Sequence, residues 1–418
     1  MTKLLQILDI TSTTVDTTLF NITAINRRHD PYWVEFAETD FNRAGVQISV
    51  LPLSQIDKNK KWLINVDILN HMWYQHPGDI FESFDPEILK ELQYGNAYLI
   101  LNHQCESFTH SFFKILYKKL QEYPVIPFNK IIYMVASIDA QREYDKFVSD
   151  FSIDKKDRIE IMYVHHVYKR FHHDTDLNFF DYDRKVKKEK KYLSLNRRWR
   201  KHRLLMVAAL SAKDLLKDGF VSLGVEEENR ESAYQTVLHY CRDNMLNTDL
   251  IGGFAKIKDQ LPLHADPVDL SINHFGHNTL PIEYYQQSCF SLVSSTNGIQ
   301  ALEPSAGFTE KEIKPILARH PFIIHNNPGV LKAMRDMGFL TFGKWFNESY
   351  DTEPNDMKRL DMIVNEVKRL SDLSFEEWEV MLDEMEPVLN HNYNRLVNYT
   401  NEHCFFNSDL KNLIYYAN

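Results

Sequence analysis

Glycine is scarce in this sequence, with 13 among 418 residues. Neither GxGxxG nor GxxxxGK[ST] occurs, so the chain lacks the glycine-rich loops that bind phosphate in dinucleotide-binding domains and P-loop kinases. Its four cysteines lie far apart and form no CxxC pair, which favours free thiols in a reducing compartment. These absences argue against the commonest nucleotide-binding motifs and against a disulfide framework.

Long hydrophobic runs and an excess of positive charge are also missing. No stretch of about 18 apolar residues occurs, so no membrane span is expected. Asp9 interrupts the first apolar stretch before a secretory signal could form. The formal net charge is -10, which argues against nonspecific coating of nucleic acid, because such binding depends on neutralising phosphates. We expect a cytoplasmic protein.

The length predicts two domains, because a single core seldom serves so long a chain. Short apolar runs alternate with polar helical stretches, which is typical of a doubly wound parallel sheet. We predict an α/β protein with Rossmann-like domains at 1–184 and 185–375, and C-terminal helices at 376–418 that pack back on the first domain. Expected strands in the first domain are 4–10, 46–51, 62–68, 97–101, 131–136 and 159–164.

In the second half the expected strands are 192–195, 219–224, 290–295, 321–325 and 339–342. Residues 245–285 contain a glycine pair and scattered histidines, and we interpret them as a loop-rich region. The last two predicted helices cover 374–385 and 386–402.

A basic turn, NRRWRKHR (196–203), follows the strand expected at 192–195. It places Asn196, Arg198 and Arg203 where a strand leads into a helix. A helix N-terminus carries unpaired N–H groups and a positive dipole end that attract anions. We interpret the turn as a binding site for a diphosphate, with a solvated basic turn or a nucleic-acid-binding patch as the alternatives.

A second helix is expected to begin near Thr309, between the strands at 290–295 and 321–325. Glu310, Lys311 and Lys314 lie in its first turns. One acceptor and two cations at such a helix start suit a ligand with hydroxyls and phosphates. The alternative is that Glu310 caps the helix and that the lysines form a solvated face.

Two further places carry groups that could take part in chemistry. His103 and Glu106 follow the strand at 97–101, at a carboxyl end where ligands gather, and are candidates for a general base. Glu106 could equally cap the next helix. Residues 170–191 are interpreted as a linker; alternatively, Asp181 and Asp183 hold a divalent cation against a diphosphate.

The segment FTEKEIKPILARHPFII (308–324) resembles the donor-binding Thr-Glu-Lys element of GT-B-type glycosyltransferases of the fucosyltransferase kind. It is also similar to glycosyltransferase-like proteins of tailed phages and large DNA viruses, in which NPG, GF-x-TF and ESYD follow. Here these motifs are residues 327–329, 338–342 and 348–351. YLSLNRRWRKHR (192–203) resembles the phosphate-binding turn that opens the C-terminal half of that family, so the resemblance covers roughly residues 190–370.

The resemblance implies a GT-B fold, in which two Rossmann-like domains face each other across a cleft, the C-terminal one for a nucleotide sugar and the N-terminal one for the acceptor. It implies that Glu310 accepts hydrogen bonds from ribose or sugar hydroxyls. Lys311 or Lys314 would neutralise the diphosphate, as would Arg198 and Arg203, with no metal and no cofactor besides the donor.

The implied activity is transfer of a hexose or pentose to a hydroxyl group. Its acceptor is a glycan or a hydroxymethylated base in phage DNA, in the host cytoplasm if the protein is viral. Two alternatives stay open. One is a non-enzymatic nucleic-acid-binding protein that uses residues 196–203, and the other is a metal-dependent GT-A-type transferase that uses Asp181 and Asp183.

Overall fold

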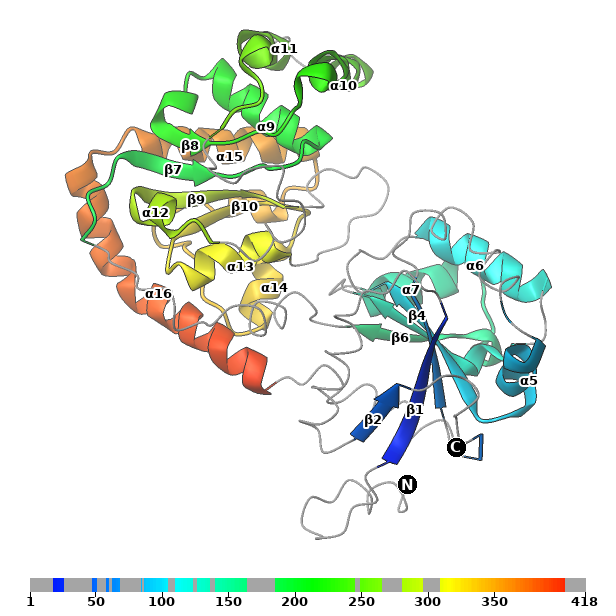
Figure 1. The fold of residues 1–418 in the computed structure, drawn as a ribbon. Coiled ribbons are helices and arrows are strands. Elements are labelled where there is room, and N and C mark those ends of the chain that lie inside the picture. Colours follow the sequence, from blue (N-terminus) through cyan, green and yellow to red (C-terminus); the bar gives the residue numbers. More distant parts are fainter. Residues whose placement is uncertain are drawn as a thin grey trace. The chain divides into compact units, whose positions relative to one another are not determined.

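The computed structural model (Figure 1) describes residues 18–25, 47–50, 58–59, 62–67, 84, 86–103, 110–122, 126–135, 140–163, 185–244, 249–264, 280–295 and 309–402. The chain divides into two units, Met1–His166 with Thr400–Asn418, and Val167–Tyr399. Each unit contains a parallel sheet with helices in the connections, which confirms the predicted α/β class. The predicted cleft between two domains stays a prediction.

The first unit holds a six-stranded sheet of order β2-β1-β3-β4-β5-β6, and all its neighbouring strands run parallel. The expected strands from residue 46 onward are present, while β1 was not expected and the predicted strand 4–10 lies outside the described residues. The strands are β1 (Thr18–Ile25), β2 (Gln47–Val50), β3 (Trp62–Asp67), β4 (Ala97–His103), β5 (Ile131–Val135) and β6 (Glu160–Tyr163).

Apolar runs and aromatic side chains build the core of this unit. Every residue of β5 is buried, as expected for a parallel strand that is covered on both faces. Phe113 packs edge-on against Tyr133, with ring centroids 4.9 Å apart. The described helices of the first unit are α5 (Pro86–Tyr94), α6 (His110–Glu122) and α7 (Ala140–Asp150).

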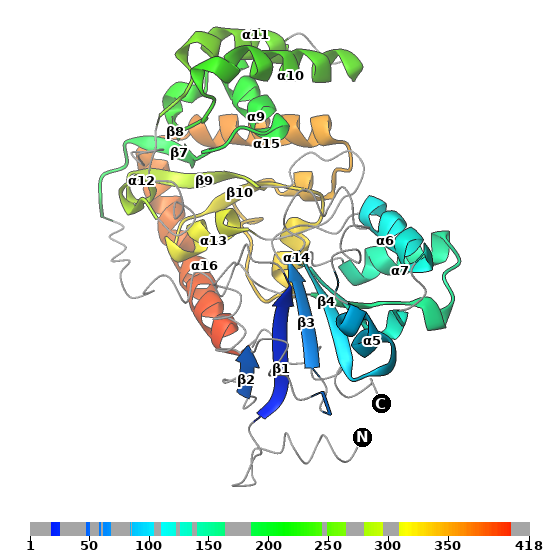
Figure 2. The same ribbon diagram turned by 45° about the vertical axis from the view of Figure 1, so that its right-hand side comes forward.

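The second unit has a four-stranded parallel sheet of order β10-β9-β7-β8. Its strands are β7 (Lys190–Ser194), β8 (Gly219–Val221), β9 (Ser288–Ser294) and β10 (Phe322–His325). Its helices are α9 (Lys201–Ala212), α10 (Arg230–Asp243), α11 (Asp249–Ile257), α12 (Ile282–Gln286), α13 (Glu310–Leu317), α14 (Val330–Asp336), α15 (Asp356–Ser371) and α16 (Phe375–Glu402). Figures 1 and 2 show α9 and α15 on one face of this sheet and α13 on the other.

The C-terminal helices differ from the prediction. A single helix, α16, replaces the two expected helices and continues through Pro387. Its residues as far as Tyr399 belong to the second unit, whereas Thr400–Asn418 belong to the first, and the predicted packing of 376–418 on the first domain stays a prediction. Trp378 stacks on Phe290 of β9, with ring centroids 5.3 Å apart. The guanidinium carbon of Arg319 lies over the ring of Tyr393, 3.8 Å from the ring centroid. These aromatic contacts hold α16 against its own unit.

The prediction of a strand at 339–342 is also wrong, because this segment pairs with no strand that the structure describes. Side chains make the backbone hydrogen bonds that a strand would have made. The Asn392 side chain both accepts from the Leu340 N–H and donates to the Leu340 carbonyl, each at 2.8 Å. Glu348 accepts from the Phe342 N–H at 2.6 Å. Among the described residues, no helix has the length and apolar character needed to cross a membrane.

The loop-rich interpretation of 245–285 missed α11, which contains the glycine pair Gly252 and Gly253. Gly253 is buried where α11 crosses α9, and a Cβ there would lie 2.2 Å from the Ala208 carbonyl oxygen. Gly252 is exposed, and a Cβ there would meet nothing within 4 Å. The glycine pair therefore serves a close helix crossing.

We expect Gly253→Ala to lower the free energy of unfolding by about 1–3 kcal/mol, because the methyl group must push the two helix backbones apart. Gly252→Ala is the matched control and should raise stability by about 0.5–1 kcal/mol, because alanine loses less backbone entropy in a helix. Urea denaturation followed by circular dichroism measures both. Equal effects at the two positions would contradict the close crossing.

Candidate functional site

The winding of the second sheet reverses between β7 and β9. β7 leads through α9 to β8 on one side, whereas β9 leads through α13 to β10 on the other. In open α/β sheets, ligands bind beyond the carboxyl ends of the strands at such a switch point. The basic turn follows β7, and Glu312 in the first turn of α13 bonds to Ser295, the residue after β9. Both predicted donor-binding segments therefore lie at this place in the sheet.

Asn196 anchors the basic turn to the neighbouring strand ends. Its N–H donates to Ser222 Oγ at 2.8 Å, its carbonyl accepts from the Gly224 N–H at 2.9 Å, and its Nδ2 donates to Ser194 Oγ at 3.2 Å. Gly224 must be glycine, since a Cβ there would lie 1.8 Å from the Arg197 carbonyl oxygen. Asn196 is fully buried, so any effect on a ligand would act through the position of the turn.

Arg203 joins the basic turn to the end of β9. Its Nη1 donates to the Arg198 carbonyl at 2.8 Å and its Nη2 to the Ser295 carbonyl at 3.2 Å. The side chain is buried, and its Nε has no hydrogen-bond partner. Burial, with Arg200 nearby, lowers the pKa of Arg203 to about 10, so the guanidinium is still charged at neutral pH. Arg198 and Arg200 are exposed.

The N-terminus of α13 is closed by a capping box. Glu312 accepts from the Thr309 N–H at 2.8 Å and from Thr309 Oγ1 at 2.7 Å, and Thr309 Oγ1 accepts from the Lys311 N–H at 3.3 Å. The capping glutamate is therefore Glu312 and not Glu310. The Glu310 side chain is one-fifth exposed and lies 3.6 Å from the Lys311 ammonium.

The two basic segments influence each other electrostatically. Burial lowers the pKa of Lys311; Glu310 opposes this shift and Arg203 adds to it. Glu310 likewise opposes the lowering of the pKa of Arg203. The structure thus brings Arg203 near Glu310 and Lys311, which follow it in the chain by about a hundred residues. Lys314 lies in the last turn of α13 and is half-buried.

Sequence reasoning missed several residues of this site. His202 contacts the Ser295 carbonyl through Nε2 at 2.6 Å, beside the bond from Arg203. His325, at the end of β10, is fully buried with neither ring nitrogen hydrogen-bonded, and its ring centroid lies 6.0 Å from that of His202. The Thr-x-x-Glu spacing of Thr309 and Glu312 was a readable signal for the capping box. No sequence pattern distinguishes the two histidines from ordinary core residues.

Three buried histidines should make the protein sensitive to acid. Burial lowers the pKa of His202 and of His320 to about 3, and that of His325 well below its usual range. In the unfolded chain they titrate near 6.5. Unfolding therefore takes up protons below that pH, and each histidine removes about 1.4 kcal/mol of stability per pH unit as the pH falls from about 6.5 towards 3.

Wild type should lose stability between pH 6.5 and pH 5 more steeply than His325→Gln does. The difference in slope should be about 1.4 kcal/mol per pH unit, which corresponds to one proton fewer taken up on unfolding. Burial raises the pKa of Glu312 and Glu348, which acts in the opposite direction, so the comparison with wild type isolates the histidine. His239→Gln, at an exposed position, is the control. Urea denaturation across this pH range measures the slopes, and identical slopes for wild type and His325→Gln would refute the expectation.

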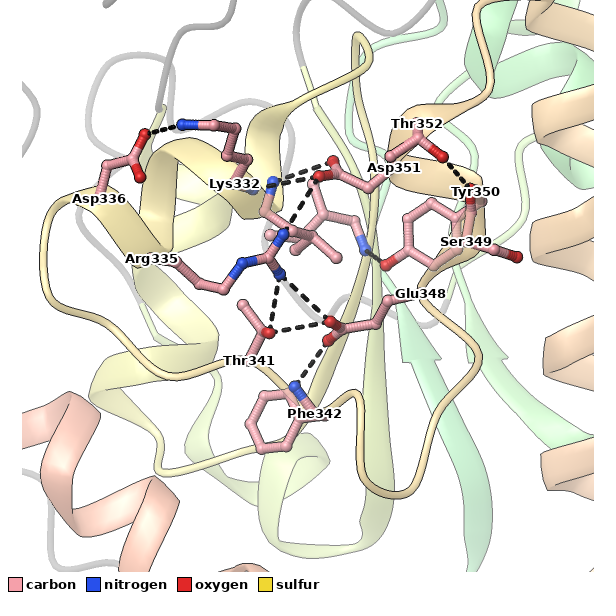
Figure 3. A network of polar contacts seen from close by, with 12 residues as sticks. Lys332, Arg335, Asp336, Thr341, Phe342, Glu348, Ser349, Tyr350, Asp351 and Thr352 are labelled. Carbon is pink, nitrogen blue, oxygen red and sulfur yellow. Dashed lines mark hydrogen bonds and ion pairs between the residues drawn. The ribbon is translucent and has the colours of Figure 1, made fainter.

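The three short motifs of the resemblance meet in one network, and Figure 3 shows the part of it that joins GF-x-TF and ESYD to α14. The Asp351 carboxylate accepts from the Leu331 N–H at 2.9 Å and the Lys332 N–H at 3.1 Å, and its carbonyl accepts from the Gly329 N–H at 2.7 Å. Gly329 has a φ of 86°, in the left-handed region that favours glycine. NPG and ESYD therefore act together to start α14.

GF-x-TF joins the same network through Glu348. This half-buried carboxylate accepts from Thr341 Oγ1 at 2.8 Å, besides its bond from Phe342. Arg335 lies 3.4 Å from Glu348 and 3.9 Å from Asp351, and so connects the two carboxylates (Figure 3). These motifs thus have a structural explanation that needs no ligand.

The predicted residues of the first unit and of the linker stay predictions. β4 ends at His103, at the carboxyl edge of its sheet as expected. The side chain of His103 and the whole of Glu106 lie outside what the structure describes, as do Asp181 and Asp183.

No protein-family model and no curated protein matches this chain. One similar solved structure is an alpha1,3-fucosyltransferase with GDP, with a TM-score of 0.33 and 12% identity, covering 97% of this chain and 96% of that chain. Another is an alpha1,3-fucosyltransferase with GDP-fucose, also with a TM-score of 0.33 and 12% identity, covering 89% of this chain and 83% of that one.

Proposed function

We propose that the protein is a glycosyltransferase of GT-B type, and that Val167–Tyr399 binds the diphosphate of a nucleotide-sugar donor at the carboxyl ends of β7 and β9. The observation that carries the proposal is the convergence of Arg203 and Lys311 at the switch point of the sheet. Two buried or half-buried cations at one place are costly unless an anion compensates them. The carboxyl groups that the chain itself places beside them are Glu310 and the buried Glu312, which also closes the start of α13.

The chemistry gives these cations a role in the transition state. The acceptor oxygen would attack the anomeric carbon while the bond from that carbon to the diphosphate oxygen breaks. Negative charge then develops on the departing nucleoside diphosphate, and fixed cations stabilise it with little reorganisation. Lys311, Arg203 and the exposed Arg198 are the candidates for this role. Glu310, at the start of α13, would accept hydrogen bonds from ribose or sugar hydroxyls.

The first unit would bind the acceptor. A hydroxyl nucleophile needs a general base within hydrogen-bond reach, and His103 or Glu106 after β4 is our proposal for it. A glycan and a hydroxymethylated base are both proposed acceptors, and the second requires a base taken out of the stack. We further propose a cytoplasmic protein that uses its donor without a metal.

A thermal-shift screen with UDP, GDP, CMP and their sugars tests the donor site. A nucleotide at a hundred times its Kd should stabilise the protein by about 2.7 kcal/mol, which raises the Tm by several degrees. The control is the same screen in EDTA, where unchanged shifts would remove the metal-dependent alternative at Asp181 and Asp183. If no nucleotide raises the Tm, the proposal loses its basis.

The basic turn keeps two cations exposed, Arg198 and Arg200, so the nucleic-acid-binding alternative has to be separated by experiment. Of its predicted contact residues, Asn196 and Arg203 are buried, and Arg198 is exposed. A phosphate-binding face needs several exposed cations, and its affinity falls steeply with salt. Binding of DNA or RNA that weakens strongly between 50 and about 200 mM salt, without any nucleotide-sugar binding, would favour that alternative.

A further inference from the structure

A continuous set of hydrogen bonds connects the basic turn to the start of α13. Arg203 and His202 both contact the Ser295 carbonyl. The Ser295 hydroxyl accepts from Asn326 Nδ2 at 3.1 Å and bonds to Glu312. These contacts link α9, the end of β9, the end of β10 and α13 at the switch point.

Glu312 is the meeting point of this set. Its Oε2 accepts from the Thr309 N–H and hydroxyl, and its Oε1 lies 3.3 Å from Asn326 Nδ2. The residue is 1% exposed, so it does not itself meet a ligand from solvent. Its two neighbours in the helix, Glu310 and Lys311, are partly exposed. Both oxygens of the carboxylate are thus used to fix the first turn of α13.

We propose that Glu312 is a positioning residue, whose buried carboxylate fixes Lys311 and Glu310 relative to Arg203 so that the two sides of the diphosphate site match. This inference rests on the proposed donor site. A carboxylate offers only acceptors, and the four groups around it, from Thr309, Ser295 and Asn326, can all donate. A glutamine side chain would turn an NH₂ group towards one of these donors and displace the helix start.

Glu348 provides a matched control within the same unit. It too is a glutamate that accepts from a threonine hydroxyl and a backbone N–H, those of Thr341 and Phe342, although its side chain is half-buried. It lies in the network around α14 and not in the hydrogen-bond set around Ser295. Glu312→Gln and Glu348→Gln should therefore both lower stability, but only Glu312→Gln should change binding at the switch point.

The experiment is isothermal titration calorimetry of the full chain with pyrophosphate, UDP and GDP at pH 7.5, for wild type and both variants. We expect Glu312→Gln to weaken binding about tenfold, since it disturbs hydrogen bonds to a charged group, and Glu348→Gln to leave it unchanged. The ratio between wild type and Glu312→Gln should shrink as the pH falls towards 5, because protonated Glu312 resembles glutamine. The other charged and titratable groups near the start of α13, Arg203, Lys311, Glu310 and His202, are the same in both proteins, so the ratio isolates Glu312.

Three results would overturn the inference in different ways. If wild type binds none of the three probes, the proposed donor site fails and the inference fails with it. If wild type binds and Glu312→Gln binds equally well, the positioning role alone is wrong. If Glu348→Gln weakens binding as much as Glu312→Gln does, the effect reflects general loss of stability and Glu312 has no special position.

Discussion

Lys311→Met is expected to weaken the binding of a nucleoside diphosphate by about 10- to 100-fold, the range for hydrogen bonds to charged groups. The substitution removes the ammonium and keeps most of the apolar stem. Lys311 is the predicted lysine whose charge interacts with Arg203 and with His202. Its side chain is 19% exposed, so water screens its interaction with a phosphate only partly.

Calorimetric titration with the nucleotide identified in the thermal-shift screen measures this effect. Lys332→Met is the control, because the Lys332 side chain is 70% exposed on α14 and pairs with Asp336. The sequence does not decide whether Lys311 or Lys314 binds the diphosphate, and Lys314→Met tests this. We expect Lys314→Met to weaken nucleotide binding less than Lys311→Met does. If Lys314→Met lost more nucleotide affinity than Lys311→Met, Lys314 would be the lysine that binds the diphosphate.

Asp351→Ala is expected to lower the free energy of unfolding by about 2–4 kcal/mol, the combined cost of a lost helix cap and unpaired buried N–H groups. Asp351 is 3% exposed. Its two oxygens accept from the first N–H groups of α14, at Leu331 and Lys332 (Figure 3). Alanine would leave these donors without a partner and remove a neighbour of the Arg335 guanidinium.

Asp336→Ala is the matched control on the same helix. Asp336 pairs with Lys332 at the surface (Figure 3), and the two side chains are 62% and 70% exposed. Such pairs contribute about 0–1 kcal/mol, so this variant should unfold close to wild type in urea. If Asp351→Ala were as stable as Asp336→Ala, the Figure 3 network would not hold α14 in place.

Elements with a strong local signal were predictable. Apolar runs bounded by turn residues located β3 to β6 and β9, because such runs can satisfy both their backbone and their burial in a covered parallel sheet. The prediction failed where tertiary contacts decided. Residues 339–342 have a strand-like composition, but Asn392 and Glu348 take the hydrogen bonds that a neighbouring strand would supply. Gly252 and Gly253 indicated a loop, because a close helix crossing is invisible in one segment alone.

The candidate site shows the same division. The sequence by itself determined that a basic turn follows a strand and that Glu310 and Lys311 open a helix, because strand-to-helix punctuation is local. The capping box of Thr309 and Glu312 is equally local. Only the tertiary structure decided that Arg203 is buried against Ser295 and that Lys311 is the lysine whose charge acts on it. The physical reason is that burial and electrostatic interaction depend on neighbours about a hundred residues away, which no local pattern records.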